Sequence, residues 1–208
     1  MKYIYEFIGA FFLVFTVGMT VMDPNGVGIM APLAIGSALG VMVCAGGYVS
    51  GGHYNPAVSF SVFLSNKLSF KDLIGYWIVQ LLGGLAAGYL TVYFKGGISN
   101  FPLNMDVVKA FIAEFLFTFA LCYVVLNVAV AKKTAGNSFY GWAIGFTVLV
   151  GAYAVGAVSG GAFNPAVALG ITVVGLSVWQ NIWIYIVANL LGGALAALIF
   201  KGVEKRSA

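Results

Sequence analysis

The strongest constraint on this chain is a short segment that occurs twice, 109 positions apart. Residues 50–58 read Ser-Gly-Gly-His-Tyr-Asn-Pro-Ala-Val, and residues 159–167 read Ser-Gly-Gly-Ala-Phe-Asn-Pro-Ala-Val. Asparagine followed by proline is typical of a helix N-cap and first helical position. The apolar segment of about ten residues that follows each copy would rise about 15 Å as a helix, half the hydrocarbon thickness of a bilayer. Each copy therefore predicts a loop that enters a membrane, becomes helical and ends midway.

The composition also indicates a membrane protein. Hydrophobic residues make up 62% of the chain and charged residues 8%, with a mean hydropathy of +1.01, which excludes a soluble globular domain. The first apolar stretch begins at once and contains Glu6, so we expect no cleavable signal. Cys44 and Cys122 lie within apolar stretches, so a disulfide is not implied. Six stretches come close to spanning length: 3–22, 31–49, 71–94, 107–131, 138–158 and 179–201.

Lysine and arginine are unevenly distributed between the predicted connections. Only Lys95 and Lys109 flank the predicted outer loop. If the N-terminus is cytoplasmic, the other eight of the ten basic residues lie inside: Lys2, Lys67, Lys71, Lys132, Lys133, Lys201, Lys205 and Arg206. Because cytoplasmic connections are rich in these residues, we expect a multi-pass protein with both termini in the cytoplasm.

Other segments repeat at nearly the same offset. Glu114-Phe115 echoes Glu6-Phe7, and the Gly-Gly pair at 192–193 echoes the pair at 83–84. We therefore expect a single membrane domain over residues 1–208, made of two repeats of about 1–97 and 104–208. Each repeat has three full spans, and because this number is odd, the second repeat is inverted in the membrane. The two half-helices then enter from opposite faces, and their N-termini meet at the midplane. The predicted fold class is an all-α membrane protein with six transmembrane helices plus two half-helices.

Non-helical backbone at membrane depth is tolerated only where it is buried in protein or lines a water-filled path. The loops 50–54 and 159–163 each offer a row of main-chain carbonyls, so we expect an aqueous path beside them. The residues predicted to provide this path are Gly51, Gly52, His53, Tyr54, Gly160, Ala162 and Phe163.

The doubled Asn-Pro-Ala, the Ser-Gly-Gly-His before its first copy and a glutamate in the first and fourth spans resemble the aquaporin, or major intrinsic protein, family. The resemblance covers essentially the whole chain. It implies a homotetramer in a lipid bilayer with one pore for water and small neutral solutes in each protomer. Glu6 and Glu114 would be structural anchors that accept hydrogen bonds from the loop backbones, with a proton relay as the alternative. The implied pore midplane consists of Asn55, Pro56, Ala57, Asn164, Pro165 and Ala166.

At this midplane each asparagine oxygen is expected to cap its own half-helix while the NH2 group stays available as a donor. Two converging donors would hold the oxygen of a passing water and interrupt a proton wire. The two helix N-termini together place about one positive charge where a cation must pass. A purely capping role for Asn55 and Asn164 is the alternative.

The resemblance also locates a second constriction, and there the chain departs from its relatives. Water-specific members have an aromatic residue, a histidine, a small residue and an arginine; the arginine directly follows the second Asn-Pro-Ala. Glycerol-selective members keep the arginine and usually follow it with aspartate, whereas Ala168 occupies that place here. The valine at the arginine position most resembles certain plant vacuolar members. The corresponding filter residues are Ile35, Ala152, Gly161 and Val167.

Such a filter is wider, apolar and uncharged. We expect it to pass neutral solutes broadly, including ammonia, glycerol, urea or hydrogen peroxide, with water still passing. The alternative is that another side chain fills the gap, for instance Tyr153 or Phe146. His53, the only histidine, is expected either to line the cytoplasmic vestibule and respond to pH or to order its loop.

Two other functions remain open. A coupled secondary transporter shares broken helices and inverted repeats, but normally has more ionisable groups near the midplane than the two glutamates here. A structural junction protein is the second, although the short connections give little surface for adhesion. An enzyme is not expected, because the chain has one histidine, no metal-ligand cluster and no serine–histidine spacing. Neither a cofactor, a metal nor a nucleic acid partner is expected.

Overall fold

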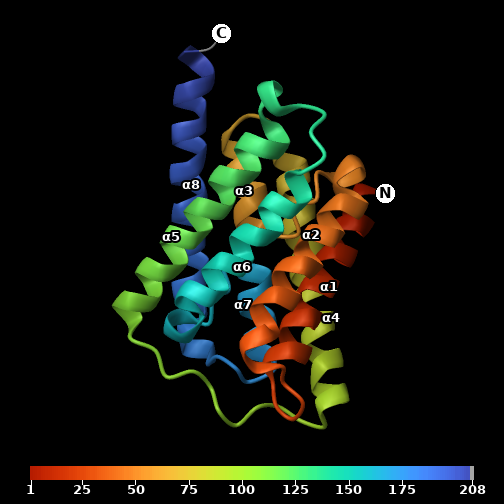
Figure 1. Cartoon of the computed structure of the whole chain (residues 1–208), viewed down its shortest axis with the longest axis vertical. Coiled ribbons are helices and arrows are strands. Elements are labelled where there is room, and N and C mark those ends of the chain that lie inside the picture. The colour runs from red at the N-terminus through yellow and green to blue at the C-terminus, as the bar shows by residue number, and fades with distance from the viewer. Residues whose placement is uncertain (207–208) are drawn as a thin grey trace.

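The computed structural model describes residues 1–206, and within that range its regular structure is entirely helical (Figure 1). Two short helices, α3 (Pro56–Leu64) and α7 (Pro165–Val173), stop partway through the bundle. Short 3-10 or π segments, η1 to η4, cover Gly28–Met30, Leu126–Val130, Lys132–Thr134 and Trp179–Asn181. Six helices are long and apolar enough to cross a membrane: α1 (Lys2–Val21), α2 (Ala31–Ser50), α4 (Phe70–Lys95), α5 (Val107–Val125), α6 (Tyr140–Ser159) and α8 (Ile182–Arg206).

The predicted fold class is confirmed: there are six membrane-spanning helices and two half-helices. The observed spans begin and end within a few residues of those expected from hydropathy. The half-helices begin at the prolines of the two Asn-Pro-Ala motifs, as their capping pattern predicts. The main irregularity that hydropathy did not indicate is the π segment that extends α5 over Leu126–Val130.

Glycines allow the long helices to pack with their backbones close together. A Cβ atom built on Gly83 of α4 would lie 2.7 Å from the main-chain oxygen of Phe7 in α1. The matching position in the second repeat, Gly192 of α8, would place its Cβ 2.6 Å from the oxygen of Phe115 in α5. The pairs α1–α4 and α5–α8 are therefore built in the same way, and α2 and α6 join the two repeats by their own extensive contact.

The neighbouring glycines hold the half-helices. A Cβ on Gly84 would lie 2.6 Å from the main-chain oxygen of Ala166 in α7, and one on Gly193 would lie 2.8 Å from that of Ala57 in α3. α4 thus supports the start of α7, and α8 supports the start of α3. A long helix of each repeat therefore packs against the half-helix of the other repeat, and the two repeats are interlocked at the centre of the bundle.

Both termini lie toward the same end of the bundle, opposite the 96–106 loop (Figure 1). We call these the termini end and the loop end. Salt bridges at the termini end join Lys2 to Asp72 over 2.7 Å and Lys67 to Glu204 over 3.1 Å. The side chains of Lys205 and Arg206, and all of residues 207–208, lie outside the described part of the chain.

Candidate functional site

Each half-helix begins with the same cap. The Oδ1 atom of Asn55 accepts a hydrogen bond from the main-chain N–H of Ala57 over 2.8 Å, and Oδ1 of Asn164 accepts from Ala166 over 2.9 Å. Both asparagines have extended backbones and are followed by proline, whose missing N–H is no loss at a first helical position. The half-helices therefore start where the local sequence dictates.

The two caps are also bonded to each other's loops. Nδ2 of Asn55 donates to the main-chain oxygen of Phe163 over 2.9 Å, and Nδ2 of Asn164 donates to that of Tyr54 over 2.9 Å. A carboxamide NH2 has two hydrogens, so one hydrogen of each asparagine remains for a passing molecule. The expected donor at each cap therefore has one hydrogen engaged by the oppositely directed loop, which lies within bonding distance.

Buried carboxylates hold the two loops. In the first repeat Glu6 accepts from the Ser50 hydroxyl (2.7 Å) and from the main-chain N–H groups of His53 (2.9 Å) and Tyr54 (2.6 Å). The carboxylate has no exposed surface. The free-energy cost of burying it is offset by the several donors that surround it. It therefore fixes the loop from within the protein.

Glu114 does the same in the second repeat. It accepts from the Ser159 hydroxyl (2.8 Å) and from the N–H groups of Ala162 (2.9 Å) and Phe163 (2.7 Å), and it too is fully buried. The hydroxyl of Tyr185 donates to the main-chain oxygen of Ser159 over 2.7 Å, which places this buried tyrosine as a second support of the loop. Both carboxylates therefore have their oxygens occupied by donors of the loop that follows α2 or α6.

The first repeat has a polar chain from Glu6 to His53, of which the second repeat keeps only a buried amide, Asn189, in the place of Gln80. Nε2 of Gln80 donates to Glu6 (2.8 Å) and to the hydroxyl of Ser59 (2.9 Å), and that hydroxyl lies 3.1 Å from Nδ1 of His53. In the second repeat the counterpart of Ser59 is Ala168 and that of His53 is Ala162. His53 is thus bonded into the loop network and also lines the cavity described next. Sequence reasoning missed Gln80, although it is a polar residue within an apolar span and Asn189 stands at the matching position of the second repeat.

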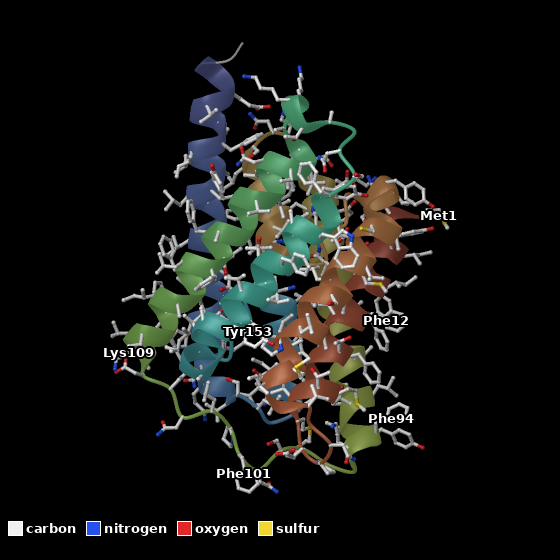
Figure 2. All side chains as sticks on the ribbon, in the orientation of Figure 1. Met1, Phe12, Phe94, Phe101, Lys109 and Tyr153 are labelled. Atoms are coloured by element: carbon white, nitrogen blue, oxygen red, sulfur yellow. The ribbon has the colours of Figure 1, made fainter. Side chains whose placement is uncertain are left out.

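A cavity of about 550 Å³ passes between the two caps. It extends from Phe101 at the loop end (Figure 2), past Asn55 and Asn164, to His53 and Val125 toward the termini end. Among the described residues that line it, only four side chains have polar atoms, and none of the four is an acid, a lysine or an arginine: His53, Asn55, Tyr153 and Asn164. The cavity is therefore apolar over most of its length, with the two asparagine caps at its middle.

All four residues predicted for the filter line this cavity: Ile35 of α2, Ala152 of α6, Gly161 of the second loop and Val167 of α7. Of the two side chains considered as substitutes, Tyr153 lines the cavity, on α6 (Figure 2), and is about half exposed. Phe146 is not among the lining residues and packs beside Trp142 instead.

The predicted carbonyl path is only partly present along this cavity. His53, Gly160 and Ala162 line it, whereas Gly51, Gly52, Tyr54 and Phe163 do not. The rings of Tyr54 and Phe163 are buried, and their main-chain oxygens accept the asparagine hydrogen bonds. The main-chain oxygens of Tyr54 and Phe163 therefore each accept one hydrogen bond from an asparagine cap, and their place in the predicted path stays a prediction.

Only the asparagine of each motif lines the cavity. Ala57 and Ala166 are completely buried, in close approach to the helix glycines, and the rings of Pro56 and Pro165 face away toward α4 and α8. The prolines and alanines therefore position the caps. The loop-end residues Phe101 and Leu103, which line the cavity, carried no signal in the sequence.

The 96–106 loop is fastened at the mouth of the cavity. The N–H of Ser99 donates to the oxygen of Val174 over 2.8 Å, and that of Leu103 to the oxygen of Leu176 over 3.0 Å. The end of α7 thus sets where this loop lies. Among the described residues, no group of three or more histidine, cysteine or acidic residues is arranged to hold a metal ion.

The chain is similar to known proteins in sequence and in fold. The sequence model of the family described as major intrinsic protein matches residues 1–200. Aquaporin TIP1-2 of Musa acuminata is 42% identical over 180 residues, which cover 84% of this chain and 71% of the relative. Glycerol uptake facilitator protein-like 6 of Lactiplantibacillus plantarum is 35% identical over 94% of each chain.

A solved structure, that of the aquaglyceroporin from Plasmodium falciparum, superimposes with a TM-score of 0.79. The superposition covers 96% of this chain and 94% of that one at 22% identity. At that identity the likeness shows the fold alone.

Proposed function

Because the chain belongs to the major intrinsic protein family, we propose that it is a passive membrane channel for water and small neutral solutes, broad in selectivity and closed to ions. The observation that carries this proposal is the cavity between the two asparagine caps, whose described lining contains no acid, lysine or arginine. Its relatives include proteins named as aquaporins and as a glycerol uptake facilitator. Their names agree with a channel for water and small solutes.

Ions would be excluded at the midplane, by the asparagine donors and the two helix N-termini. One N–H of Asn55 and one of Asn164 remain after the loop bonds are made, and both residues line the cavity. These donors would hold the oxygen of a water and turn its hydrogens away from both caps, so that a proton cannot be passed along a continuous water chain. The two helix N-termini add about half a positive charge each, which repels cations.

Solute selectivity would be determined at the proposed filter, formed by Ile35, Ala152, Gly161 and Val167. An arginine in place of Val167 would add about one further unit charge and several donors. With valine there, the constriction is wider and offers little to replace the hydration of a polar solute. Solutes that lose little on dehydration, such as ammonia, would pass most easily, and glycerol, urea and hydrogen peroxide would be admitted. Tyr153 supplies the one side-chain hydroxyl along the described lining.

A coupled transporter fits the structure less well. Coupling needs an ionisable group that meets the transported ion, and Glu6 and Glu114 are fully buried with their oxygens occupied by loop donors. Neither of them lines the cavity. These contacts favour the passive channel.

The assembly and the orientation are further parts of the proposal, supported by the family and by the charge distribution respectively. We infer a homotetramer from the resemblance to the family, and one pore per protomer because a single chain already encloses its own cavity between the caps. We also infer that the termini end is cytoplasmic, because most of the lysines belong to connections at that end.

The direct test is flux through liposomes that contain the purified protein, followed by stopped-flow light scattering. We expect permeability to water, glycerol and urea, entry of ammonia, and no proton or sodium leak above empty liposomes. Water flux without ammonia, urea or glycerol flux would overturn the broad selectivity. Solute flux that follows a proton or sodium gradient would establish the coupled transporter instead, and the absence of any flux would favour the junction protein.

A further inference from the structure

A second cavity, of about 280 Å³, lies on the side of the half-helices that faces α4 and α8. Six of its eight lining residues form three pairs that are 109 positions apart: Pro56 with Pro165, Trp77 with Ile186, and Leu81 with Leu190. Because matched positions of both repeats surround it, the cavity lies where the two repeats meet. It is separate from the pore cavity, with which it shares no lining residue.

Its lining is hydrocarbon. All eight lining side chains are apolar except for the indole N–H of Trp77, which already donates to the main-chain oxygen of Pro56 over 2.9 Å. A buried water needs two to four polar partners to be held. The cavity therefore offers no place for water or for a polar ligand.

The cavity lies at the depth of the bilayer centre. Leu81 is near the middle of the 26-residue helix α4, and the two prolines begin the half-helices that meet midway through the bundle. α4 and α8 each pack against α3 and α7, but no comparable contact joins α4 to α8 among the described residues. The flanking side chains Ile78 and Leu191 are about half exposed, as lipid-facing residues are. The gap therefore opens sideways into hydrocarbon.

We propose that this cavity binds one acyl chain of a bilayer lipid, which enters between α4 and α8 and covers the rings of Pro56 and Pro165. A protein helix is too wide to be the occupant, since one turn about 10 Å across and 5.4 Å long fills roughly 400 Å³. A single hydrocarbon chain is narrow enough and has the right chemistry. Lipid tails are as apolar as the lining, so the chain is held by packing contacts that an empty cavity would lack.

Trp77 allows a direct test, because bromine atoms on lipid chains quench indole fluorescence on contact. Trp142, Trp179 and Trp183 would be replaced by phenylalanine, leaving Trp77 as the only tryptophan. The protein would be reconstituted in phosphatidylcholine brominated near the headgroup, midway along the chain or near its end. We expect quenching of Trp77 that is strongest for bromines in the deep half of the chain.

The matched variant is Leu169→Phe, which copies the residue at the corresponding position of the first repeat, Phe60, and fills the cavity. Leu190→Phe fills it from α8 and serves if the first variant does not fold. Either should abolish most of the Trp77 quenching. Leu198→Phe, on an outward face of α8 where the side chain is 68% exposed, should leave it unchanged.

Two results would overturn the proposal. The first is Trp77 fluorescence that no brominated chain quenches, which would mean that the cavity is empty or covered by another protein. The second is quenching that persists at full strength in both filled variants, which would mean that lipid touches the indole only from outside the cavity. A protein that retains Trp183 as its only tryptophan monitors general lipid contact, and its quenching should not respond to Leu169→Phe.

Discussion

The side-chain amide of Asn55 donates to the main-chain carbonyl of Phe163 over 2.9 Å, and so joins the cap of one half-helix to the loop that leads into the other. Asn164 makes the mirror-related bond to Tyr54. The two remaining amide hydrogens are thereby fixed relative to each other, since neither cap can move without its partner's loop. This coupling gives the proposed midplane donors a definite geometry.

Asn164→Asp tests that geometry. Aspartate still caps a helix, but it has no hydrogen to donate to Tyr54 or to a passing water, and its negative charge offsets the field of the helix N-termini. We expect a measurable proton leak into liposomes that contain a pH-sensitive dye, together with altered water flux.

Asn127→Asp is the control for that substitution, because Asn127 bonds to Tyr123 at the exposed end of α5, away from the cavity. It should leave proton exclusion intact. Unchanged proton exclusion and water flux in Asn164→Asp would remove the midplane role.

Glu114→Gln tests the anchoring of the second loop. One carboxylate oxygen becomes an NH2 group that faces existing donors at Ser159, Ala162 or Phe163. An unsatisfied buried donor costs about 1–3 kcal/mol, so thermal unfolding in lipid should shift to a clearly lower temperature. Glu204→Gln, which removes only a partly exposed salt bridge to Lys67, should change stability by about 0–1 kcal/mol. Equal effects of the two substitutions would contradict the anchoring.

The fold could be predicted from the sequence to a large extent, because hydropathy and capping are local. The six spans and both half-helices follow from apolar length and from asparagine before proline. The glycines at 51 and 52 also predicted an irregular backbone over residues 50–54. In the structure Gly51 ends α2 in a left-handed conformation with φ of 89°, which suits glycine.

The site could be predicted only in part. The four residues predicted to form a filter all line the cavity, and their role as a filter stays a prediction. The bonds from these asparagines to Tyr54 and Phe163 could not be foreseen, since they depend on the distance between two loops over a hundred residues apart. The same holds for Phe101, whose place at the cavity mouth is set by main-chain bonds of its loop to the end of α7.

Gly84→Ala tests the interlocking of the repeats. Its new methyl would lie 2.6 Å from the main-chain oxygen of Ala166, and a backbone atom cannot yield as a side-chain end can. Overpacking of this kind costs about 1–3 kcal/mol, so we expect lower thermal stability and lower solute flux. Gly202→Ala is the matched control on α8, where a Cβ meets nothing within 4 Å. If Gly84→Ala is as stable and active as the control, the close approach does not position α7.

Tyr153→Phe tests the hydroxyl of the cavity lining. If this hydroxyl assists polar solutes, its loss should reduce glycerol and urea permeability about two- to tenfold, the effect of one hydrogen bond of 0.5–1.5 kcal/mol. Ammonia entry should change little, because ammonia needs less help to lose its hydration. Tyr123→Phe, outside the cavity, should alter none of these fluxes. A uniform loss of all solutes in Tyr153→Phe would indicate a structural effect instead.

The most direct test of the account is the ratio of urea to water permeability in the parent protein and in Val167→Arg, measured in the same liposomes by stopped-flow light scattering. Arginine would add bulk, donors and about one unit charge to the filter, so we predict that the ratio falls about tenfold, a barrier difference of about 1.4 kcal/mol. A parent protein that passes water but excludes urea, or a ratio that Val167→Arg leaves unchanged, would contradict the proposal that an apolar, uncharged filter makes this channel broadly selective.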